Sequence, residues 1–171
     1  RGQQYKGLTS REIAKTAGVP LGMINYCFGS KDNLVLQVFL DTYEKKMEEE
    51  QHEEVLKFYK DVNNPLEFFR ISAFKIMKAF LDHYECTESI LKYIITEYSV
   101  EKTLKGHVIL KEYYGDSKSE EECKRFAFMM SNVFQLAILR HKEYKENFGI
   151  DLLDDKQLMI FINEQIERFV C

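Results

Sequence analysis

Residues 8–34 read LTSREIAKTAGVPLGMINYCFGSKDNL and carry the start and stop signals of short helices. Thr9 and Glu12 form a capping box, in which the threonine hydroxyl accepts a backbone N–H and the glutamate reaches back, so a helix begins here. Gly18 ends this helix, because glycine tolerates the left-handed conformation of a helix end. Pro20 suits the first turn of a second helix. The pattern predicts two short helices joined by a tight turn.

The second helix is predicted to end near Phe28, and Ser30 is predicted to cap a third helix. An apolar seam joins the first two helices, and its small residues allow the helices to cross closely. The seam consists of Ile13, Ala14, Ala17, Val19, Ile24 and Phe28. With this seam buried, the other side of the second helix faces outward.

This arrangement resembles the helix-turn-helix of TetR-family transcriptional regulators. The resemblance rests on residues at fixed spacing: Thr9, Ile13, Ala14, Ala17, Gly18, Val19, Gly22, Phe28, Ser30, Lys31 and Leu34. It covers only the N-terminal part of the chain, and the remainder resembles the family in being helical, acidic and of suitable length. The family has a helix before the motif, which residues 1–7 are too few to supply. We therefore expect residues to be missing from the N-terminus of this sequence. A head that lacks part of its core is the alternative.

The second helix is predicted to enter the major groove of DNA, which is wide enough for one helix. The resemblance implies that the starts of the first and third helices contact the duplex as well. The predicted DNA-contacting residues are Ser10, Arg11, Leu21, Gly22, Met23, Asn25, Tyr26 and Lys31.

The chemistry of five of these residues suggests their roles. The planar guanidinium of Arg11 matches O6 and N7 of guanine. Asn25 offers a donor and an acceptor to a base edge, and Met23 offers apolar contact to a thymine methyl group. Tyr26 is suited to a phosphate or a base. Lys31 adds a full charge to the partial positive charge of a helix N-terminus, which favours a phosphate.

The sequence departs from the usual family pattern in the second helix. A lysine or similar polar residue, a threonine and two aromatic residues recur where Leu21, Met23, Asn25 and Cys27 stand here. Individual base contacts are therefore not transferred from the family. Cys27 is expected to pack as a small core residue in place of a ring. A redox-sensing thiol is the alternative.

The charge of the chain is unevenly distributed. The first 35 residues carry five cations and two anions, a net charge of +3, whereas the whole chain has −4 and the remainder therefore −7. A basic N-terminal region joined to an acidic remainder favours a nucleic-acid-binding domain attached to a second module with another function. Ordinary solvation of a protein surface is the alternative explanation.

Beyond the motif the chain is expected to be all-α. It has 8 glycines and 2 prolines in 171 residues, half the average usage of roughly 12% for the two together, which indicates few turns and long elements. We expect a central helix after the cap at Asn64 and Pro65, a helix capped by Thr87, a helix over Val100 to Tyr113, a helix starting at a capping box of Ser119 and Glu122, and a last helix capped by Asp154 or Asp155.

The predicted boundary between two domains lies near Tyr43. Residues 1–43 form the helix-turn-helix DNA-binding domain, and residues 44–171 form a helical bundle for ligand binding and dimerisation. The two C-terminal helices carry more apolar surface than one bundle can cover, which favours a homodimer formed through them. Core helices of a monomer are the alternative.

The resemblance also implies a pocket for a small apolar or aromatic effector in the body. The candidate lining residues are Phe74, Met77, Phe80, Tyr84, Tyr93, Phe126 and Met130. An aromatic-rich core without a pocket is the alternative, because rings and methionines at helical spacing commonly fill cores.

The sequence as a whole predicts a ligand-responsive DNA-binding transcriptional regulator, a repressor. As a homodimer it binds a near-palindromic operator of double-stranded DNA and is released by the small-molecule effector. A helical protein-interaction module without DNA binding is the alternative.

Several other classes of protein are not expected. No arrangement of nucleophile, base and orienting acid and no glycine-rich phosphate loop indicates an enzyme, and no cofactor is expected. His83 and Cys86 alone are too few for a metal site. The four scattered cysteines favour reduced thiols, and we find neither a transmembrane segment nor a signal peptide. We therefore expect the protein in the cytoplasm and not in a membrane.

Overall fold

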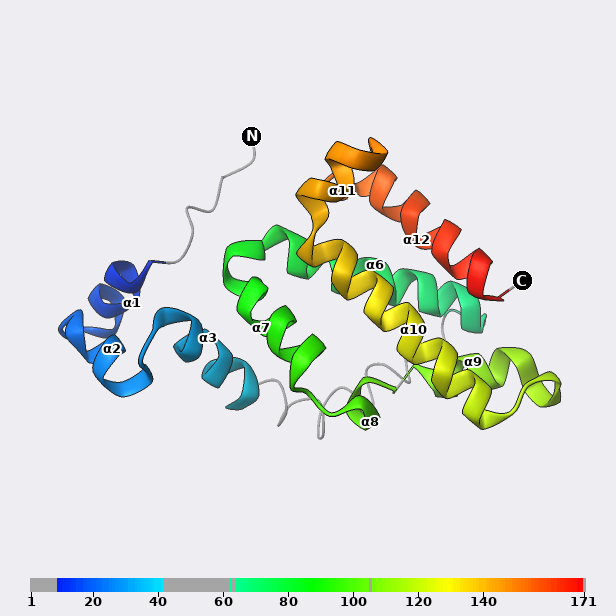
Figure 1. Ribbon diagram of the computed structural model, residues 1–171, viewed down its shortest axis with the longest axis horizontal. Helices are drawn as coiled ribbons and strands as arrows, with labels where there is room; N and C mark the ends of the chain where they lie inside the picture. The colour runs from blue at the N-terminus through cyan, green and yellow to red at the C-terminus, as the bar shows by residue number, and fades with distance from the viewer. Residues whose placement is uncertain (1–8, 42–61, 63, 105, 171) are drawn as a thin grey trace.

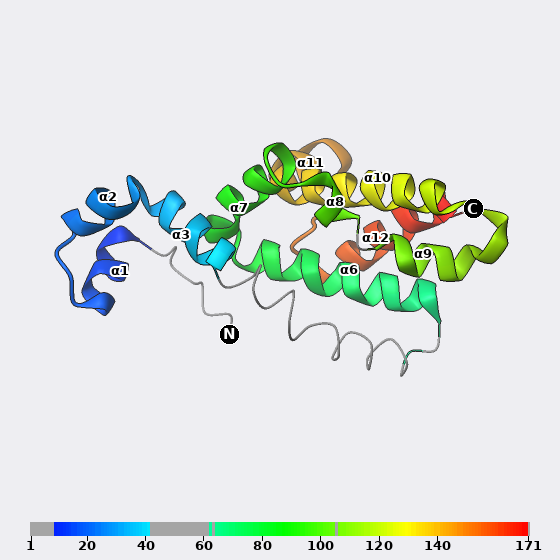
Figure 2. The same cartoon turned by 90° about the horizontal axis from the view of Figure 1, so that it is seen from below.

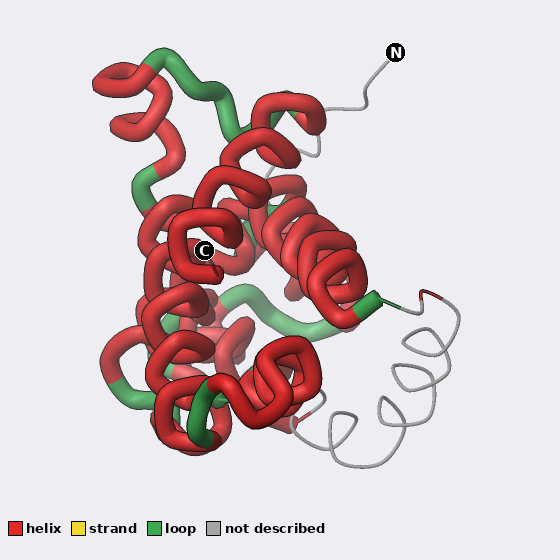
Figure 3. Tube along the Cα trace, turned by 90° about the vertical axis from the view of Figure 1, so that its right-hand side faces the viewer, coloured by secondary structure: helices red, strands yellow, loops and turns green. Residues whose placement is uncertain are grey.

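The computed structural model describes residues 9–41, 62, 64–104 and 106–170 (Figure 1). In these residues every regular element is a helix, as Figure 3 shows, so the predicted all-α class is confirmed. The α-helices are α1 (Ser10–Ala17), α2 (Gly22–Phe28), α3 (Lys31–Phe39), α6 (Pro65–Asp82), α7 (Tyr84–Thr96), α8 (Val100–Thr103), α9 (His107–Tyr114), α10 (Glu120–Leu139), α11 (His141–Phe148) and α12 (Asp155–Val170), and η2 (Gly115–Ser117) is a 3-10 helix. None of these described helices is long and apolar enough to cross a membrane.

The helices form a small head and a larger body. Helices α1, α2 and α3 lie together at one end of the molecule, and α6 to α12 extend away from them (Figures 1 and 2). Helix α3 packs against α7, and this contact joins the head to the body. The predicted domain boundary at Tyr43, and residues 1–7 before the motif, lie outside the described residues.

Capping interactions set the ends of α1 as the sequence predicts. The hydroxyl oxygen of Thr9 accepts the backbone N–H of Glu12 at 3.2 Å, and the carboxylate of Glu12 accepts the backbone N–H of Thr9 at 3.0 Å. At the other end Gly18 has a φ of 68° and closes the helix in the left-handed conformation. The predicted capping box and glycine stop are both confirmed.

The next two helices follow the same local rules with one shift. Helix α2 begins at Gly22, two residues after the predicted start, because the carbonyl of Pro20 accepts the N–H of Met23 in a turn at 2.9 Å before the helix is established. Ser30 caps α3 as predicted, since its hydroxyl oxygen accepts the N–H of Asn33 at 3.0 Å.

Helix α6 has the central position that its apolar sequence predicts. Asn64 caps it by accepting the N–H groups of Leu66 and Glu67 at 3.0 and 3.2 Å. The helix contacts α7, α9, α10 and α12. It is not enclosed on every side by the described residues, because Ile76 is 54% exposed.

The prediction that Thr87 caps a helix is wrong. Helix α7 begins at Tyr84, directly after the junction residue His83, so Thr87 lies within its first turns. The Thr87 hydroxyl donates a hydrogen bond to the carbonyl of Phe80 at 2.8 Å. It also lies 3.2 Å from the carbonyl of His83, four residues before it, which is the usual back-bond of a threonine inside a helix. The bond to Phe80 crosses from one helix to the other. Here the bond ties the start of α7 to the end of α6.

The predicted helix over Val100 to Tyr113 is divided into α8 and α9. The division falls at Gly106, where a Cβ atom would lie 3.2 Å from the ring of Phe69. The backbone therefore approaches α6 closely at this point. Glycine also lowers helix stability because it loses more conformational freedom on folding than any other residue. The low helix propensity of glycine favours a break here, and the close approach to Phe69 favours a residue without a Cβ.

The main hydrophobic core lies entirely in the body. Helix α10, which begins at the predicted capping box of Ser119 and Glu122, supplies its largest share. The buried core residues are Ala73, Met77, Leu81, Leu91, Leu110, Cys123, Ala127, Met130, Phe134, Ala137, Ile138, Leu152, Leu158, Phe161, Ile162 and Ile166. Both predicted C-terminal helices thus bury one face within their own chain.

Helix α11 lies between these two helices and is not predicted by the sequence pattern. Most of its side chains are exposed, so it has little apolar periodicity. His141 at its start is buried, with Nδ1 3.0 Å from the carbonyl oxygen of Ile138 and its ring edge-to-face with that of Tyr84. This mostly polar helix is therefore held to the body by His141 and by the ring of Tyr144, which packs against the core beside Phe161.

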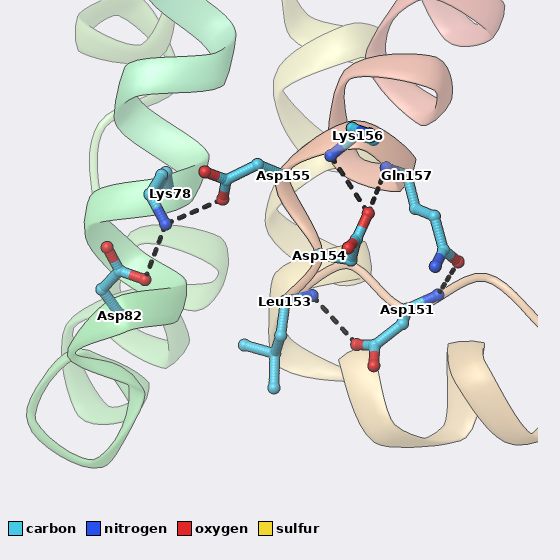
Figure 4. A network of polar contacts seen from close by, with 8 residues as sticks. All are labelled: Lys78, Asp82, Asp151, Leu153, Asp154, Asp155, Lys156 and Gln157. Atoms are coloured by element: carbon cyan, nitrogen blue, oxygen red, sulfur yellow. Dashed lines mark hydrogen bonds and ion pairs between the residues drawn. The ribbon is translucent and has the colours of Figure 1, made fainter. Parts of the chain in front are cut away.

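A polar network joins α6 to the start of α12 (Figure 4). Lys78 Nζ lies 3.1 Å from the carboxylate of Asp82 and 2.9 Å from that of Asp155. Hydrogen bonds to Asp155 and then Asp82 raise the pKa of Lys78. Asp154 caps α12 by accepting the N–H groups of Lys156 and Gln157, which confirms one of the two predicted caps.

Candidate nucleic-acid interface

Helix α2 presents most of its surface to solvent. Tyr26 is 86% exposed, and the other predicted DNA-contacting residues of this segment are exposed as well. They are Leu21, Gly22, Met23 and Asn25. Helix α2 lies at the end of the molecule farthest from most of the body (Figures 1 and 2), so the described residues leave its outer side accessible to a large partner.

One side of α2 holds it to its neighbours. Ile24 points inward and is only 3% exposed, and Ala14 of α1 is equally buried. The amide nitrogen Nδ2 of Asn33 donates to the carbonyl of Phe28 at 3.0 Å and so ties α3 to the end of α2. The same residue donates its backbone N–H to the cap Ser30. Asn33 therefore positions α2 relative to α3.

The sequence interpretation missed this role of Asn33. A serine cap is bonded by the backbone N–H three residues after it, whatever the side chain there is. The capping pattern therefore says nothing about the side chain of Asn33. Only the fold brings Phe28 within reach of its amide, because the turn at Gly29, with a φ of 75°, folds α3 back toward α2.

The start of α1 supplies two predicted contact residues with different exposure. Arg11 is exposed, whereas Ser10 is half-buried. The capping box uses the N–H groups of Thr9 and Glu12. The N–H groups of Ser10 and Arg11 belong to the first turn and have no partner within the helix, which is the arrangement that favours an anion.

Lys31 begins α3 but is less available than a free surface cation. Its side chain is only 27% exposed, and its Nζ lies 3.9 Å from the carboxylate of Asp32. The distance is too long for a hydrogen bond, so the attraction between Lys31 and the exposed carboxylate of Asp32 is weak. A phosphate that approaches the N-terminus of α3 therefore meets a cation with a carboxylate beside it.

The expected seam of the head is only partly buried in the described residues. Ala14 and Ile24 are buried and Ile13 is half-buried, but Val19 and Phe28 remain about two fifths exposed, at 40% and 37%. Ala17 is also exposed. A helix of seven residues offers few positions that face fully inward, and in α2 only Ile24 does so.

The prediction that Cys27 packs in the core is wrong. Its side chain is exposed, and it borders a surface hollow together with Phe28, Asn33, Leu36, Gln37 and Leu40. Cys27 lies three residues after the buried Ile24 and so near the same side of α2, but the hollow beside α3 leaves it uncovered by the described residues.

The candidate effector residues lie in or against the core of the body. Met77 and Met130 are almost fully buried, and Phe74, Phe80, Tyr84 and Phe126 pack against the same core. Tyr93 is half-buried and pairs edge-to-face with Tyr98. The Tyr84 hydroxyl donates to the carbonyl of Leu139 at 2.8 Å, and burial raises the pKa of this tyrosine.

The outer faces of α10 and α12 carry large apolar side chains. Phe128, Met129 and Leu136 of α10 are exposed, with Leu136 at 47%. Ile160 of α12 is exposed to a similar degree. The residues of α10 recur at steps of seven and eight positions, so they share one side of the helix.

Comparison with known proteins identifies the N-terminal segment. Residues 3–38 match the model of a family described as bacterial regulatory proteins, tetR family. This range includes all of α1 and α2 and most of α3. The resemblance predicted from residues 8–34 is thereby confirmed. No curated protein and no solved structure matches the chain.

Proposed function

We propose that this chain, a DNA-binding transcriptional regulator with a TetR-family helix-turn-helix at residues 3–38, is a ligand-responsive repressor that acts as a homodimer in the cytoplasm. Residues 1–43 serve as its DNA-binding domain and residues 44–171 as its ligand-binding and dimerisation domain. No enzymatic activity is assigned to it. The observation that carries the proposal is the outward side of α2, which is exposed from Leu21 to Tyr26 except at Ile24.

In this proposal the residues of the head contribute to DNA binding in two different ways. Arg11, Asn25 and Met23 read base edges in the major groove, as their side chains are free of the core. Ser10 and Lys31 contact phosphates at the starts of α1 and α3. The half-buried position of Lys31 supports a fixed phosphate contact, because a restrained side chain loses less entropy on binding.

A homodimer accounts for the apolar outer faces of α10 and α12. Leu136 and Ile160 are about half exposed, and paired with the same faces of a second chain they would leave water. A twofold dimer places two copies of α2 in successive major grooves, roughly 34 to 36 Å apart. The operator is then a near-palindrome of double-stranded DNA.

The proposed effector enters the aromatic-rich core formed by α6, α7 and α10. Support comes from the many rings there, among them Phe74, Phe80 and Tyr84. Met77 and Met130 are flexible side chains that can repack around a small apolar or aromatic molecule. Because α3 packs against α7, a shift of α7 would move the head. Effector and operator then weaken each other's binding by the same factor. The corresponding coupling free energy is typically about 1 to 3 kcal/mol.

The experiment that tests the proposal is selection of bound duplexes from a random pool, followed by affinity measurements with head variants. Arg11→Ala and Asn25→Ala should each cost about 1 to 3 kcal/mol, mainly on the selected sequence. Lys31→Ala should weaken binding to every duplex and flatten the dependence on salt. Lys142→Ala, an exposed lysine in α11, is the matched control and should leave binding unchanged.

Two results would contradict this proposal. Equal losses on selected and random duplexes for Arg11→Ala, Asn25→Ala and Lys31→Ala would refute the division between base and phosphate contacts. No binding to any duplex at low salt would instead favour the protein-interaction module, because phosphate contacts are strongest there.

The symmetry of the complex is tested separately by sedimentation. The proposal expects an inverted repeat among the selected duplexes and two chains on each duplex. A single chain on an asymmetric site would refute the homodimer while leaving DNA binding intact.

A further inference from the structure

Helix α2 and the residues that flank it carry no charged side chain. Residues 20–29 read PLGMINYCFG and contain no lysine, arginine, histidine, aspartate or glutamate. In the major groove guanine is most often read by arginine or lysine, and cytosine by a carboxylate that accepts a hydrogen bond from N4. This segment supplies neither kind of side chain. Its exposed residues must therefore recognise other features of a base pair.

The outward face of α2 is centred on Gly22 and Tyr26. A helix turns once in about 3.6 residues, so the positions two before and two after the buried Ile24 lie nearly opposite it. Asn25 and Met23 flank this line on its two sides, and both are exposed. Any partner that lies along the outer side of α2 therefore meets an amide on one flank and a thioether on the other.

Gly22 is a glycine that the described fold does not require. An added Cβ atom would meet nothing within 4 Å, and the residue is not among the glycines with a positive φ. Glycine in a helix also costs stability relative to alanine. A surface that approaches the backbone of α2 closely gives a reason for it, because glycine is the residue that leaves room for such an approach.

The exposed side chains of this segment match the edges of an A·T pair. The amide of Asn25 can donate to N7 and accept from N6 of adenine at the same time. Met23 and Leu21 are 41% and 46% exposed, and both end in apolar groups. Thymine is the one base that presents a methyl group in the major groove, and an apolar side chain that covers this methyl removes it from water.

We propose that α2 recognises A·T pairs of the operator. Asn25 binds adenine, and Met23 and Leu21 contact thymine methyl groups. Gly22 gives the backbone room to approach the base edges. This inference rests on the proposed DNA-binding role of the head and names the base pairs that its central helix selects. A guanine in the same operator is left to Arg11 of α1.

The direct test uses the duplex selected by the full chain and replaces its thymines one at a time by deoxyuridine. This change removes the methyl group and leaves base pairing unchanged. Affinity for the unaltered chain should fall about fourfold at one or more positions, the effect of exposing one buried methyl-sized group. At each sensitive thymine, either Met23→Ala or Leu21→Ala should abolish the difference, because the contact is already lost.

Val108→Ala is the matched control for these two variants. Val108 is an apolar side chain of α9 that is 60% exposed and lies outside the head. This variant should bind the duplex as the unaltered chain does and should keep the same sensitivity to deoxyuridine.

A second base analogue tests the contact of Asn25. Replacement of single adenines by 7-deazaadenine removes the N7 acceptor. It should weaken binding of the unaltered chain about fivefold at one or more positions, since one bond of a bidentate pair is lost. The same duplexes should bind Asn25→Ala with no further loss.

The role of Gly22 is tested by comparing stability with affinity. Gly22→Ala should unfold at the same temperature or higher, because alanine is the better helix former. The same variant should bind the selected duplex at least about fivefold more weakly, since the added methyl group holds α2 away from the bases that Asn25 contacts. A merely structural glycine would not separate the two measurements in this way.

Several results would overturn this inference while leaving DNA binding intact. They are tolerance of deoxyuridine at every thymine, tolerance of 7-deazaadenine at every adenine, a methyl effect that persists in both Met23→Ala and Leu21→Ala, and unchanged affinity of Gly22→Ala. Failure of the unaltered chain to bind any duplex would instead refute the proposed function itself.

Discussion

The head and the body of this protein are built on different principles. In the described head, residues 9–41, only Ala14 and Ile24 are buried, whereas sixteen side chains form one continuous core in the body. The head is shaped mainly by local signals: the Thr9 capping box, the Gly18 stop and the Ser30 cap. The body is shaped by contacts between residues far apart in the chain.

This difference separates stability from recognition. Burial of apolar surface is the dominant favourable term in folding, so most of the free energy of unfolding should reside in the body. The head instead keeps its side chains exposed, with Tyr26 the clearest case. A partner of the head gains contact area without disturbing a core. Mutations in the body should therefore lower the stability of the fold, and mutations in the head should lower its affinity for DNA.

The largest expected effect is in the body core. Phe161 is almost fully buried, and its ring packs on those of Phe134 and Tyr144. Phe161→Ala should lower the free energy of unfolding by about 3 to 5 kcal/mol, because the lost contacts leave a cavity. Thermal unfolding followed by circular dichroism should show a midpoint about 10 °C lower.

Phe148→Ala provides the matched control for this change. The Phe148 ring also contacts Tyr144, yet the residue is 66% exposed. Its loss should cost no more than about 1 kcal/mol. If the two variants unfold at the same midpoint, the core identified here does not determine the stability of the body.

A smaller effect is expected at two glycines that end helices in the head and in the body. Gly18 has a φ of 68° and Gly149 a φ of 70°, and an added Cβ would meet nothing within 4 Å at either position. Gly18→Ala and Gly149→Ala should therefore carry the same conformational cost, about 1 kcal/mol.

The consequences of these two changes should differ even though the local cost is the same. Gly18 joins α1 to the segment leading into α2, so its replacement should weaken DNA binding. Gly149 follows α11 in the body, and its replacement should lower thermal stability while DNA affinity is kept. Equal loss of DNA affinity in both variants would contradict the separation of the two regions.

The smallest expected effect concerns the pH dependence of the body. The pKa of Lys78 is raised above its ordinary value of 10.5, chiefly by its hydrogen bonds to Asp155 and Asp82. Because the pKa of Lys78 is higher in the folded than in the unfolded protein, its ion pairs stabilise the fold fully below pH 10.5. This stabilisation is lost as the pH rises through the folded-state pKa. Solvent screening limits the loss to about 1 kcal/mol at most.

Denaturant unfolding at neutral pH and above pH 10.5 measures this contribution. Because other groups also titrate there, the comparison is between the unaltered chain and Lys78→Met, which should lose less stability over the same interval. DNA affinity at neutral pH should be the same in both, since the pair joins α6 to α12 within the body. A steeper loss in Lys78→Met would show that the sign is wrong.

Sequence alone predicted the elements whose signals are local. The capping boxes at Thr9 and Ser119, the cap at Asn64 and the stop at Gly18 each involve residues within a few positions of one another. The same is true of the spacing that matches the family at residues 3–38. Hydrogen bonds across three or four residues do not depend on the rest of the fold, so their signatures can be read without it.

Tertiary structure decided the features that depend on distant contacts. The close approach of Gly106 to the ring of Phe69 and the exposure of Cys27 both depend on how the helices pack. Asn33 reaches the Phe28 carbonyl only after the turn between them has formed. A linear pattern records which residues are apolar or charged, but their neighbours in space are fixed only when the helices pack.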